Sequence, residues 1–167
     1  MATTTRGTYF ITLCTKPRLE LFGKITGQGA GARIELSEVG RIVEQCWNAL
    51  PAHFPSLKQE CMQIMPDHLH AIVSLSGVGS TRRVDGTAGS RASGPAPGSL
   101  GAIIGAFKYE STKLIVQQCA LSIRQVWLEG YHERIVRRQP GEYERIEQYI
   151  AENPAHWRSG DPPTPSA

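Results

Sequence analysis

Two histidines stand two residues apart in the stretch MPDHLHAIVSL, which runs from Met65 to Leu75. Side chains alternate along a strand, so His68 and His70 would project from one face while the apolar residues between them face a core. Residues two apart on a strand are separated by roughly 7 Å, so both imidazoles can reach one metal ion. The spacing leaves a second interpretation open, in which both are surface or hydrogen-bonded histidines.

A tyrosine and an asparagine near the C-terminus are candidates to complete such a site. Ile146, Tyr149, Ile150 and Asn153 recur at helical spacing and therefore share one face of a predicted helix. Tyr149 and Asn153 would be adjacent polar groups on that face. In the alternative interpretation, Tyr149 is a core aromatic with its hydroxyl at the rim, and Asn153 caps the helix before Pro154.

The elements that would position these residues alternate between strands and helices. Strands are expected at 7–17, 57–65, 68–75 and about 131–136, and helices at 38–50, 100–120 and 141–153, with a glycine-interrupted β-rich stretch at 18–37. Ser37 and Ser99 are expected to cap two of the helices, and Pro51 and Pro154 to end two of them. This order, with a hairpin in the middle, predicts an α+β fold in which one antiparallel sheet carries helices on its faces.

Length and composition limit the classes of protein. With 167 residues, 40% hydrophobic and 20% charged, the chain is expected to form a single soluble domain over 1–167. No apolar run is long enough to span a membrane and no signal peptide is evident, so a cytoplasmic location is expected. The four cysteines form no C-x-x-C pair, which argues against a zinc ribbon and a disulfide scaffold. A net charge of +3 permits a polyanionic partner.

Two segments are predicted to lack regular structure. Residues 77–98 are rich in Gly, Ser, Ala and Pro, and they cannot bury enough apolar surface to offset the loss of chain entropy. A flexible loop is therefore expected there. A disordered tail is expected at about 159–167.

Several blocks of the sequence together resemble a known family. MPDHLHAIVSL is similar to the MPNHxH signature of the HUH (His-hydrophobic-His) nucleases. GSLGAIIGAFKYESTKLI, VWLEGYHERIVR and IEQYIAENPAHW resemble successive blocks of the REP-associated tyrosine transposases, relatives of the smallest insertion-sequence transposases. GRIVEQCWNALPAHFP resembles the first helix of that family. The resemblance extends from about Tyr9 to Trp157.

The resemblance implies a fold, a site and an activity. The fold would be a ferredoxin-like sheet with the histidine pair on a central strand. The family pattern Tyr-x-x-x-Gln or Tyr-x-x-x-Asn places the nucleophile at Tyr149 and a third metal ligand at Asn153, beside His68 and His70. With bound Mg²⁺ or Mn²⁺, such an enzyme would cleave and rejoin single-stranded or hairpin DNA through a 5′-phosphotyrosine intermediate.

This chain departs from the family pattern at three positions. Asp67 stands where the family usually has Asn, which adds a carboxylate beside the histidine pair. Arg134 stands where relatives often have His. Asn153 is a shorter ligand arm than Gln.

Contacts to DNA phosphates are expected from Lys108, Lys113, Arg137 and Arg138, each of which has an alternative interpretation as a solvated surface charge. Tyr109 follows Lys108 and is a rival nucleophile that the family pattern does not favour. Two tryptophans, Trp127 and Trp157, are candidates for stacking on bases, although buried packing is the simpler interpretation.

Other functions remain open from the sequence. One is a protein that binds hairpin DNA or RNA without cutting it. A structural zinc protein is disfavoured, because a closed zinc site needs four ligands and no cysteine lies at suitable spacing. Both a monomer and a homodimer that exchanges its tyrosine helix are compatible with the resemblance.

Overall fold

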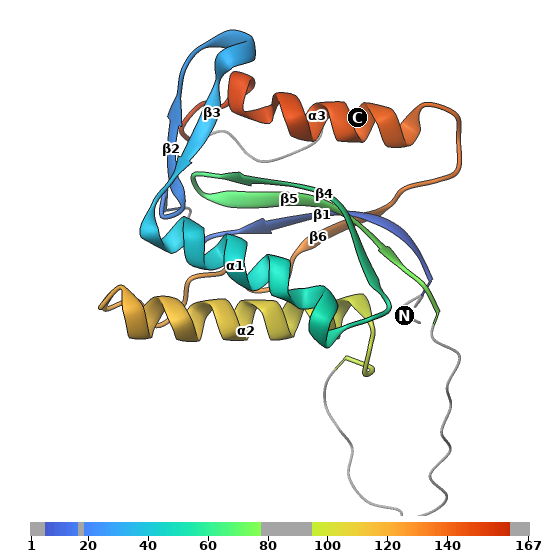
Figure 1. Ribbon diagram of the computed structural model, residues 1–167, viewed down its shortest axis with the longest axis horizontal. Helices are drawn as coiled ribbons and strands as arrows, with labels where there is room; N and C mark the ends of the chain where they lie inside the picture. Colours follow the sequence, from blue (N-terminus) through green and yellow to red (C-terminus); the bar gives the residue numbers. More distant parts are fainter. Residues whose placement is uncertain (1–5, 17–18, 78–94, 161–167) are drawn as a thin grey trace, which may run out of the picture.

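A four-stranded antiparallel sheet runs through the middle of the molecule, with two helices on one face and a third helix on the other (Figure 1). The computed structural model describes residues 6–16, 19–77 and 95–160. The elements are β1 Gly7–Cys14, β2 Gly23–Thr26, the 3-10 helix η1 Gly29–Gly31, β3 Arg33–Leu36, α1 Glu38–His53, β4 Leu57–Met65, β5 His68–Leu75, α2 Leu100–Gln118, β6 His132–Ile135 and α3 Glu142–His156. The predicted α+β class is confirmed.

The order of the strands in the sheet is β4-β5-β1-β6, and every neighbouring pair is antiparallel. The chain visits β1, α1, β4, β5, α2 and β6 in turn, which is the β-α-β-β-α-β arrangement of a ferredoxin-like fold. β5 and β1 are therefore the two central strands, and Thr12 of β1 lies opposite His70 of β5. A separate hairpin of β2 and β3 stands beside the C-terminal end of α3 (Figure 1).

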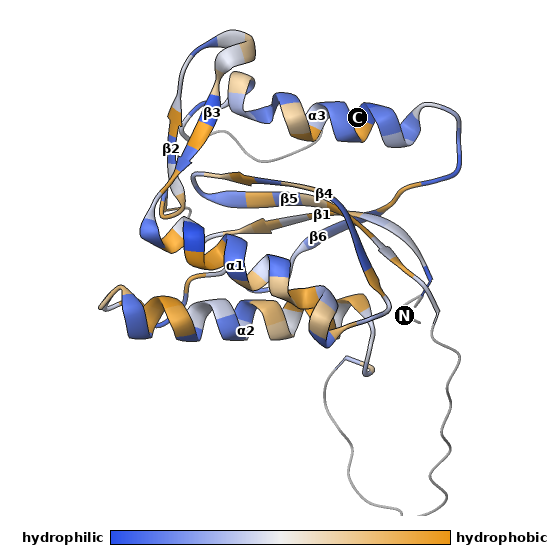
Figure 2. Cartoon of the chain, in the orientation of Figure 1, coloured by the Kyte–Doolittle hydropathy of each residue, from blue (hydrophilic) through white to orange (hydrophobic). Residues whose placement is uncertain are grey.

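The main core lies between the sheet and the pair α1 and α2. Hydrophobic and hydrophilic residues alternate in bands along the helices, as expected for elements with one buried face (Figure 2). Trp47 of α1 meets Phe107 of α2 edge to face, with ring centroids 5.3 Å apart. Trp127 packs on the same Phe107 ring and donates a hydrogen bond from Nε1 to Ser111 Oγ. Trp127 is thus a core residue, in agreement with the interpretation of buried packing.

Both predicted N-caps are confirmed. Ser37 Oγ accepts a hydrogen bond from the Gly40 backbone N–H at the start of α1, and Ser99 Oγ accepts one from the Ala102 N–H at the start of α2. None of the described helices is long and apolar enough to cross a membrane. The flexible loop predicted at 77–98 and the tail predicted at about 159–167 fall mostly outside the described residues.

The predicted ends of two helices are wrong. α1 continues through Pro51 to His53, and α3 continues through Pro154 to His156. A proline lacks the N–H that would bond the carbonyl four residues earlier, which for Pro51 is the carbonyl of Trp47. That oxygen instead accepts a hydrogen bond of 2.6 Å from Gln59 Nε2 of β4. Because the tertiary structure supplies the missing donor, α1 passes through its proline.

Two glycines in helices provide an opposed pair of stability tests. A Cβ at Gly40 would lie 2.0 Å from the backbone oxygen of Phe22, which already accepts a hydrogen bond from Ser37 N. Gly40→Ala is therefore expected to destabilise the fold by about 1–3 kcal/mol or more. At Gly105, within α2 and exposed, a Cβ meets nothing within 4 Å, so Gly105→Ala is expected to stabilise by about 0.5–1 kcal/mol. Urea unfolding of both variants measures the two signs, and a stable Gly40→Ala protein would contradict this packing.

Candidate metal and nucleophile site

The two histidines lie side by side on β5, on the sheet face that α3 covers. Leu69 and Ala71 alternate with them and enter the core beneath α1 and α2, as predicted. His68 is 1% exposed and His70 is fully buried, and their ring centroids are 4.6 Å apart. The alternative of two surface histidines is therefore excluded, and a hydrogen-bonded or ligand-binding pair remains.

Within the described residues, one nitrogen of each imidazole forms a hydrogen bond and the other does not. His70 Nδ1 hydrogen-bonds Thr12 Oγ1 at 2.8 Å, and His68 Nδ1 lies 2.6 Å from Asp67 Oδ1. An ionised carboxylate can only accept, so His68 donates to Asp67 through Nδ1–H, and the neutral form of that tautomer carries its lone pair on Nε2. The Nε2 atoms of both histidines are buried and have no hydrogen-bond partner within the described part of the chain.

The electrostatic environment keeps at least one ring neutral. Burial lowers the pKa of His70 well below its ordinary value of 6.5, and the neighbouring His68 lowers that pKa further. A neutral imidazole with a free lone pair is the form of histidine that binds metal ions.

The turn before β5 is held firmly, which fixes where the histidine pair begins. The carbonyl of Asp67 accepts hydrogen bonds from the backbone N–H of Thr15 at 2.9 Å and from Thr15 Oγ1 at 3.1 Å. The carbonyl of Pro66 accepts from Phe22 N at 3.0 Å. Asp67 itself is 2% exposed. The substitution of Asp for the family's Asn thus places a buried carboxylate directly on His68.

Tyr149 reaches the histidine pair from α3 of the same chain. Its ring centroid lies 5.6 Å from that of His70 and 6.3 Å from that of Phe10, which it meets edge to face. The side chain is half-buried, and burial raises the pKa of the phenol above 10.0, while a hydrogen bond with the Asn153 side chain lowers it in part. The phenol is therefore protonated at neutral pH.

Asn153 lies one helical turn after Tyr149 and is half-buried beside it. Both residues line a surface hollow of about 470 Å³ along α3, together with polar neighbours that include Arg145 and His156. An amide that lowers the pKa of a phenol does so by donating its N–H to the phenol oxygen, which leaves the amide oxygen as an acceptor. The structure thus brings Tyr149, Asn153 and the histidine pair together.

Thr12 and Glu142 are two residues on this side of the sheet that the sequence did not single out, and Trp157 was considered only for stacking on bases. Thr12 holds His70 through Nδ1, and the Trp157 ring lies 5.7 Å from the His68 ring, where it covers that imidazole. Glu142, at the start of α3, is only 4% exposed. Thr12 shares its strand face with Phe10 in the sequence pattern, but only the pairing of β1 with β5 shows that it meets His70.

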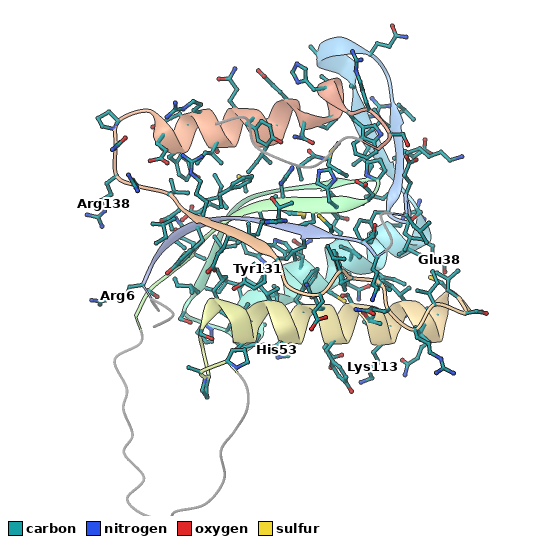
Figure 3. All side chains as sticks on the ribbon, turned by 180° about the vertical axis from the view of Figure 1, so that it is seen from behind. Arg6, Glu38, His53, Lys113, Tyr131 and Arg138 are labelled. Carbon is teal, nitrogen blue, oxygen red and sulfur yellow. The ribbon has the colours of Figure 1, made fainter. Side chains whose placement is uncertain are left out.

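The four residues expected to contact DNA phosphates lie in different parts of the molecule. Lys108 Nζ donates to the backbone carbonyls of Leu128, at 2.8 Å, and Gly130, and burial lowers its pKa. Lys113 projects from α2, away from the sheet, and lies 3.9 Å from Glu110 (Figure 3). The other two, Arg137 and Arg138, are exposed on the connection between β6 and α3. A role in DNA binding stays a prediction for all four.

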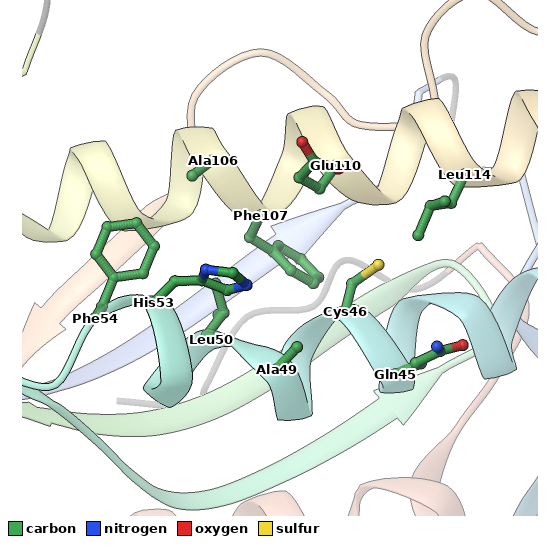
Figure 4. Close-up of a pocket in the computed structure, with 10 residues that line it drawn as sticks. All are labelled: Gln45, Cys46, Ala49, Leu50, His53, Phe54, Ala106, Phe107, Glu110 and Leu114. Carbon is green, nitrogen blue, oxygen red and sulfur yellow. The ribbon is translucent and has the colours of Figure 1, made fainter.

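A second hollow, between α1 and α2, is separate from the histidine pair (Figure 4). It has a volume of about 500 Å³ and lies on the opposite side of the sheet. Its lining is mainly apolar, with Leu50, Phe54 and Phe107 at the base and Cys46 and Glu110 among its few polar groups. None of the predicted site residues contributes to it.

Arg134, the second departure from the family pattern, fixes the beginning of α3. Its Nη2 donates to Glu142 Oε1 at 2.7 Å, and the backbone N–H of Arg137 donates to Glu142 Oε2 at 3.1 Å. Both carboxylate oxygens of Glu142 are therefore occupied by groups from β6 and the connection that follows it. Since α3 carries Tyr149, this pair sets the position of the phenol along the sheet.

Glu142→Gln is expected to loosen α3 from the sheet. The change removes a buried charge that accepts two hydrogen bonds, at a cost of about 1–3 kcal/mol. Amide hydrogen exchange should quicken across α3 and stay unchanged in α1 and α2. The matched control is Glu144→Gln, an exposed acid in the same first turn of α3. Equal exchange in the two variants would show that the Arg134–Glu142 pair does not position α3.

Comparison with proteins of known structure assigns the fold to a class. One similar structure is a REP-associated tyrosine transposase bound to a REP hairpin, with a TM-score of 0.61, 16% identity, and coverage of 93% of this chain and 71% of that chain. Another is a candidate transposase from Deinococcus radiodurans R1, with a TM-score of 0.50, 15% identity, and coverage of 90% and 92%. The fold is that of these transposases, so the predicted resemblance is confirmed at the level of the fold.

A protein from Haemophilus influenzae, described as uncharacterised, is 33% identical over 159 residues, which cover 90% of this chain and 82% of that protein. The chain belongs to the same family as this protein. No protein-family model matches the sequence. Among the described residues, no three His, Cys, Asp or Glu side chains converge as a metal-binding group.

Proposed function

We propose that the protein is a single-tyrosine DNA nuclease and transposase that cleaves and rejoins single-stranded or hairpin DNA. The observation that carries the proposal is the meeting of Tyr149 with two buried imidazoles whose Nε2 atoms have no partner in the described residues. The fold shared with transposases supports it. The REP-associated transposase of that comparison is bound to a hairpin, and we extend that class of ligand to this chain.

The residues present fit a divalent metal ion. Metal-ligating histidines generally donate their other ring N–H to a carboxylate or a second oxygen, and Asp67 and Thr12 occupy those positions here. His68 and His70 would bind through Nε2 and Asn153 through its amide oxygen. Imidazole and oxygen ligands together suit Mn²⁺ or Mg²⁺. Once bound, the ion would polarise the scissile phosphate and stabilise the charge that develops on it.

The residues of the chain would supply the nucleophile and its placement. The oxygen of Tyr149 forms a bond to phosphorus, and the bond from phosphorus to the 3′ oxygen of the preceding nucleotide breaks. The products are a 5′-phosphotyrosine and a free 3′-hydroxyl, with the phenol proton balanced by the proton that the 3′ oxygen gains. Asn153 stabilises the developing phenolate by hydrogen bonding. The phosphotyrosine conserves the bond energy, so rejoining needs no ATP.

Tyr149→Phe is expected to abolish the covalent protein–DNA adduct, because it removes the attacking oxygen and keeps the ring. The measurement is a denaturing gel of the protein with labelled single-stranded and hairpin oligonucleotides in Mn²⁺, with and without EDTA. Tyr109→Phe is the matched control, since Tyr109 is 67% exposed and lies on α2. Chelation should remove the adduct as completely as Tyr149→Phe does. Adducts that persist in Tyr149→Phe would overturn the assignment, and binding without any adduct would leave a non-catalytic hairpin-binding protein.

The proposed site is assembled within one chain, so exchange of α3 between subunits is not needed. Mixing His70→Ala with Tyr149→Phe protein is therefore expected to give no adduct, because neither chain holds a complete site. The measurement is the same gel after co-incubation or co-expression of the two variants. Recovery of about a quarter to a half of the wild-type adduct would show that a homodimer exchanges its tyrosine helices, as the sequence leaves open. A cytoplasmic location belongs with this proposal.

A further inference from the structure

A hollow at the far end of the sheet from the histidine pair lies between the beginnings of β1 and β4 and the connection from β6 to α3. Resting on the proposed function, we infer that this hollow binds the sugar–phosphate backbone of the same nucleic acid that meets Tyr149. We call it the Arg138 hollow and define it by Arg6, Thr8, Lys58, Ser74, Ser76 and Arg138, which are among its lining residues. Arg6 and Arg138 lie at the same end of the molecule, away from Lys113 on α2 (Figure 3).

The chemistry of the Arg138 hollow suits phosphate groups. It has a volume of about 600 Å³, and three cations and several hydroxyls line it without any carboxylate. Lys58 forms an ion pair of 3.0 Å with Glu60 on the exposed edge strand, an interaction that contributes little in water. Among the described residues, no ion pair engages Arg6 or Arg138. Cationic and hydroxyl side chains are the groups that proteins direct at nucleic-acid phosphates.

The hydroxyls of the hollow keep hydrogen-bonding capacity for a ligand. Thr8 Oγ1 and Ser74 Oγ share one hydrogen bond of 2.9 Å across the two central strands. Ser76 Oγ donates its single hydrogen to the carbonyl of Ser56 at 3.2 Å, so the free donor comes from the Thr8–Ser74 pair. A pair of hydroxyls that share one hydrogen bond retains one donor, and that donor can turn toward an anionic oxygen.

The position of the hollow links it to the proposed site. Ser74 and His70 lie on the same face of β5, four residues apart, which corresponds to about 13 Å along the strand. Their partners on β1, Thr8 and Thr12, lie on that face as well. Along the axis of a duplex, the phosphates of one strand follow each other every 3.4 Å or so, so about four of them span that distance. α3 packs on Phe10 and Ile72 between the two places, so a nucleic acid seated at Tyr149 would pass around α3 to reach the Arg138 hollow.

A polyanion fits better than a single small anion. The three cations come from three separate segments of the chain around a volume of about 600 Å³, which is larger than one phosphate group. The alternative hollow beside α2 is less suited to phosphates. The carboxylate of Glu129 lines it, together with Lys108 and Lys113. The Lys108 ammonium already donates to two carbonyls, and Lys113 lies 3.9 Å from Glu110.

The test measures how DNA binding depends on salt. Each phosphate contact that is lost lowers the slope of log K against log salt by about 0.7–0.9. In a Tyr149→Phe background, Lys58→Gln combined with Arg138→Gln is expected to reduce the slope for a labelled hairpin with a single-stranded extension by about 1.4–1.8, and to weaken binding at 50 mM salt roughly tenfold per contact. Fluorescence anisotropy over 50–300 mM salt gives both quantities. Circular dichroism checks that each variant is folded.

The matched control removes the same net charge elsewhere. Lys24→Gln combined with Arg41→Gln changes two exposed cations on β2 and α1. An unchanged slope in the Lys58 and Arg138 variant would overturn the inference, and so would an equal loss in the control, which would indicate only the total charge. If the variant loses binding of inorganic phosphate in an NMR titration but binds DNA normally, the hollow is a small-anion site and the inference is wrong.

Failure of this inference and failure of the proposed function give different results. The salt slope is measured in Tyr149→Phe protein and needs no catalysis, whereas adduct formation is measured with the unsubstituted chain. Binding through the Arg138 hollow without any adduct would overturn the proposed activity and leave this inference standing. Adduct formation together with an unchanged slope in the Lys58 and Arg138 variant would overturn this inference alone.

Discussion

The burial of two imidazoles between the sheet and α3 is the constraint around which this face of the molecule is arranged. A buried polar nitrogen without a hydrogen bond costs about 1–3 kcal/mol, and apolar side chains at the same positions would avoid that cost. Thr12 and Asp67 satisfy one nitrogen of each ring, while both Nε2 atoms have no partner among the described residues. Groups left in this state usually have a functional reason. The metal ion proposed above would be a shared partner for both Nε2 atoms.

α3 must be held where Tyr149 meets His70, and two unlike interactions hold it there. Ile146 and Ile150 of α3 form one apolar cluster with Phe10, Ile72 and Val136 on this face of the sheet. Apolar burial has no strong directional preference, so packing by itself would let the helix slide or rotate. The two hydrogen bonds to the Glu142 carboxylate do have direction, and they fix the helix about two turns before Tyr149. The location of the phenol therefore depends on a residue that never touches it.

The sequence predicted the features of the fold and site that are local. Alternation on β5 separated His68 and His70 from the core residues, and helical spacing joined Tyr149 to Asn153; the structure places both pairs accordingly. The contact of Thr12 with His70 depends on the pairing of β1 with β5, which a single sequence does not specify. Properties that depend on tertiary neighbours could not be predicted from the sequence either. In the sequence, Lys108 cannot be distinguished from a surface cation, because its hydrogen bonds to the carbonyls of Leu128 and Gly130 depend on the fold. The catalytic and ligand roles of the site residues stay predictions.

The two faces of the sheet differ in the polarity of the residues on their central strands. On the face beneath α1 and α2, the central strands β1 and β5 carry apolar and aromatic residues, and this face forms the core. On the face beneath α3, the central strands carry polar pairs at two levels, Thr12 with His70 and Thr8 with Ser74, and an apolar pair of Phe10 with Ile72 between them. α3 packs on the apolar pair, and the polar pairs lie on either side of that pair along the strands. A small ligand could use only one of those ends, whereas the nucleic acid proposed above could use both.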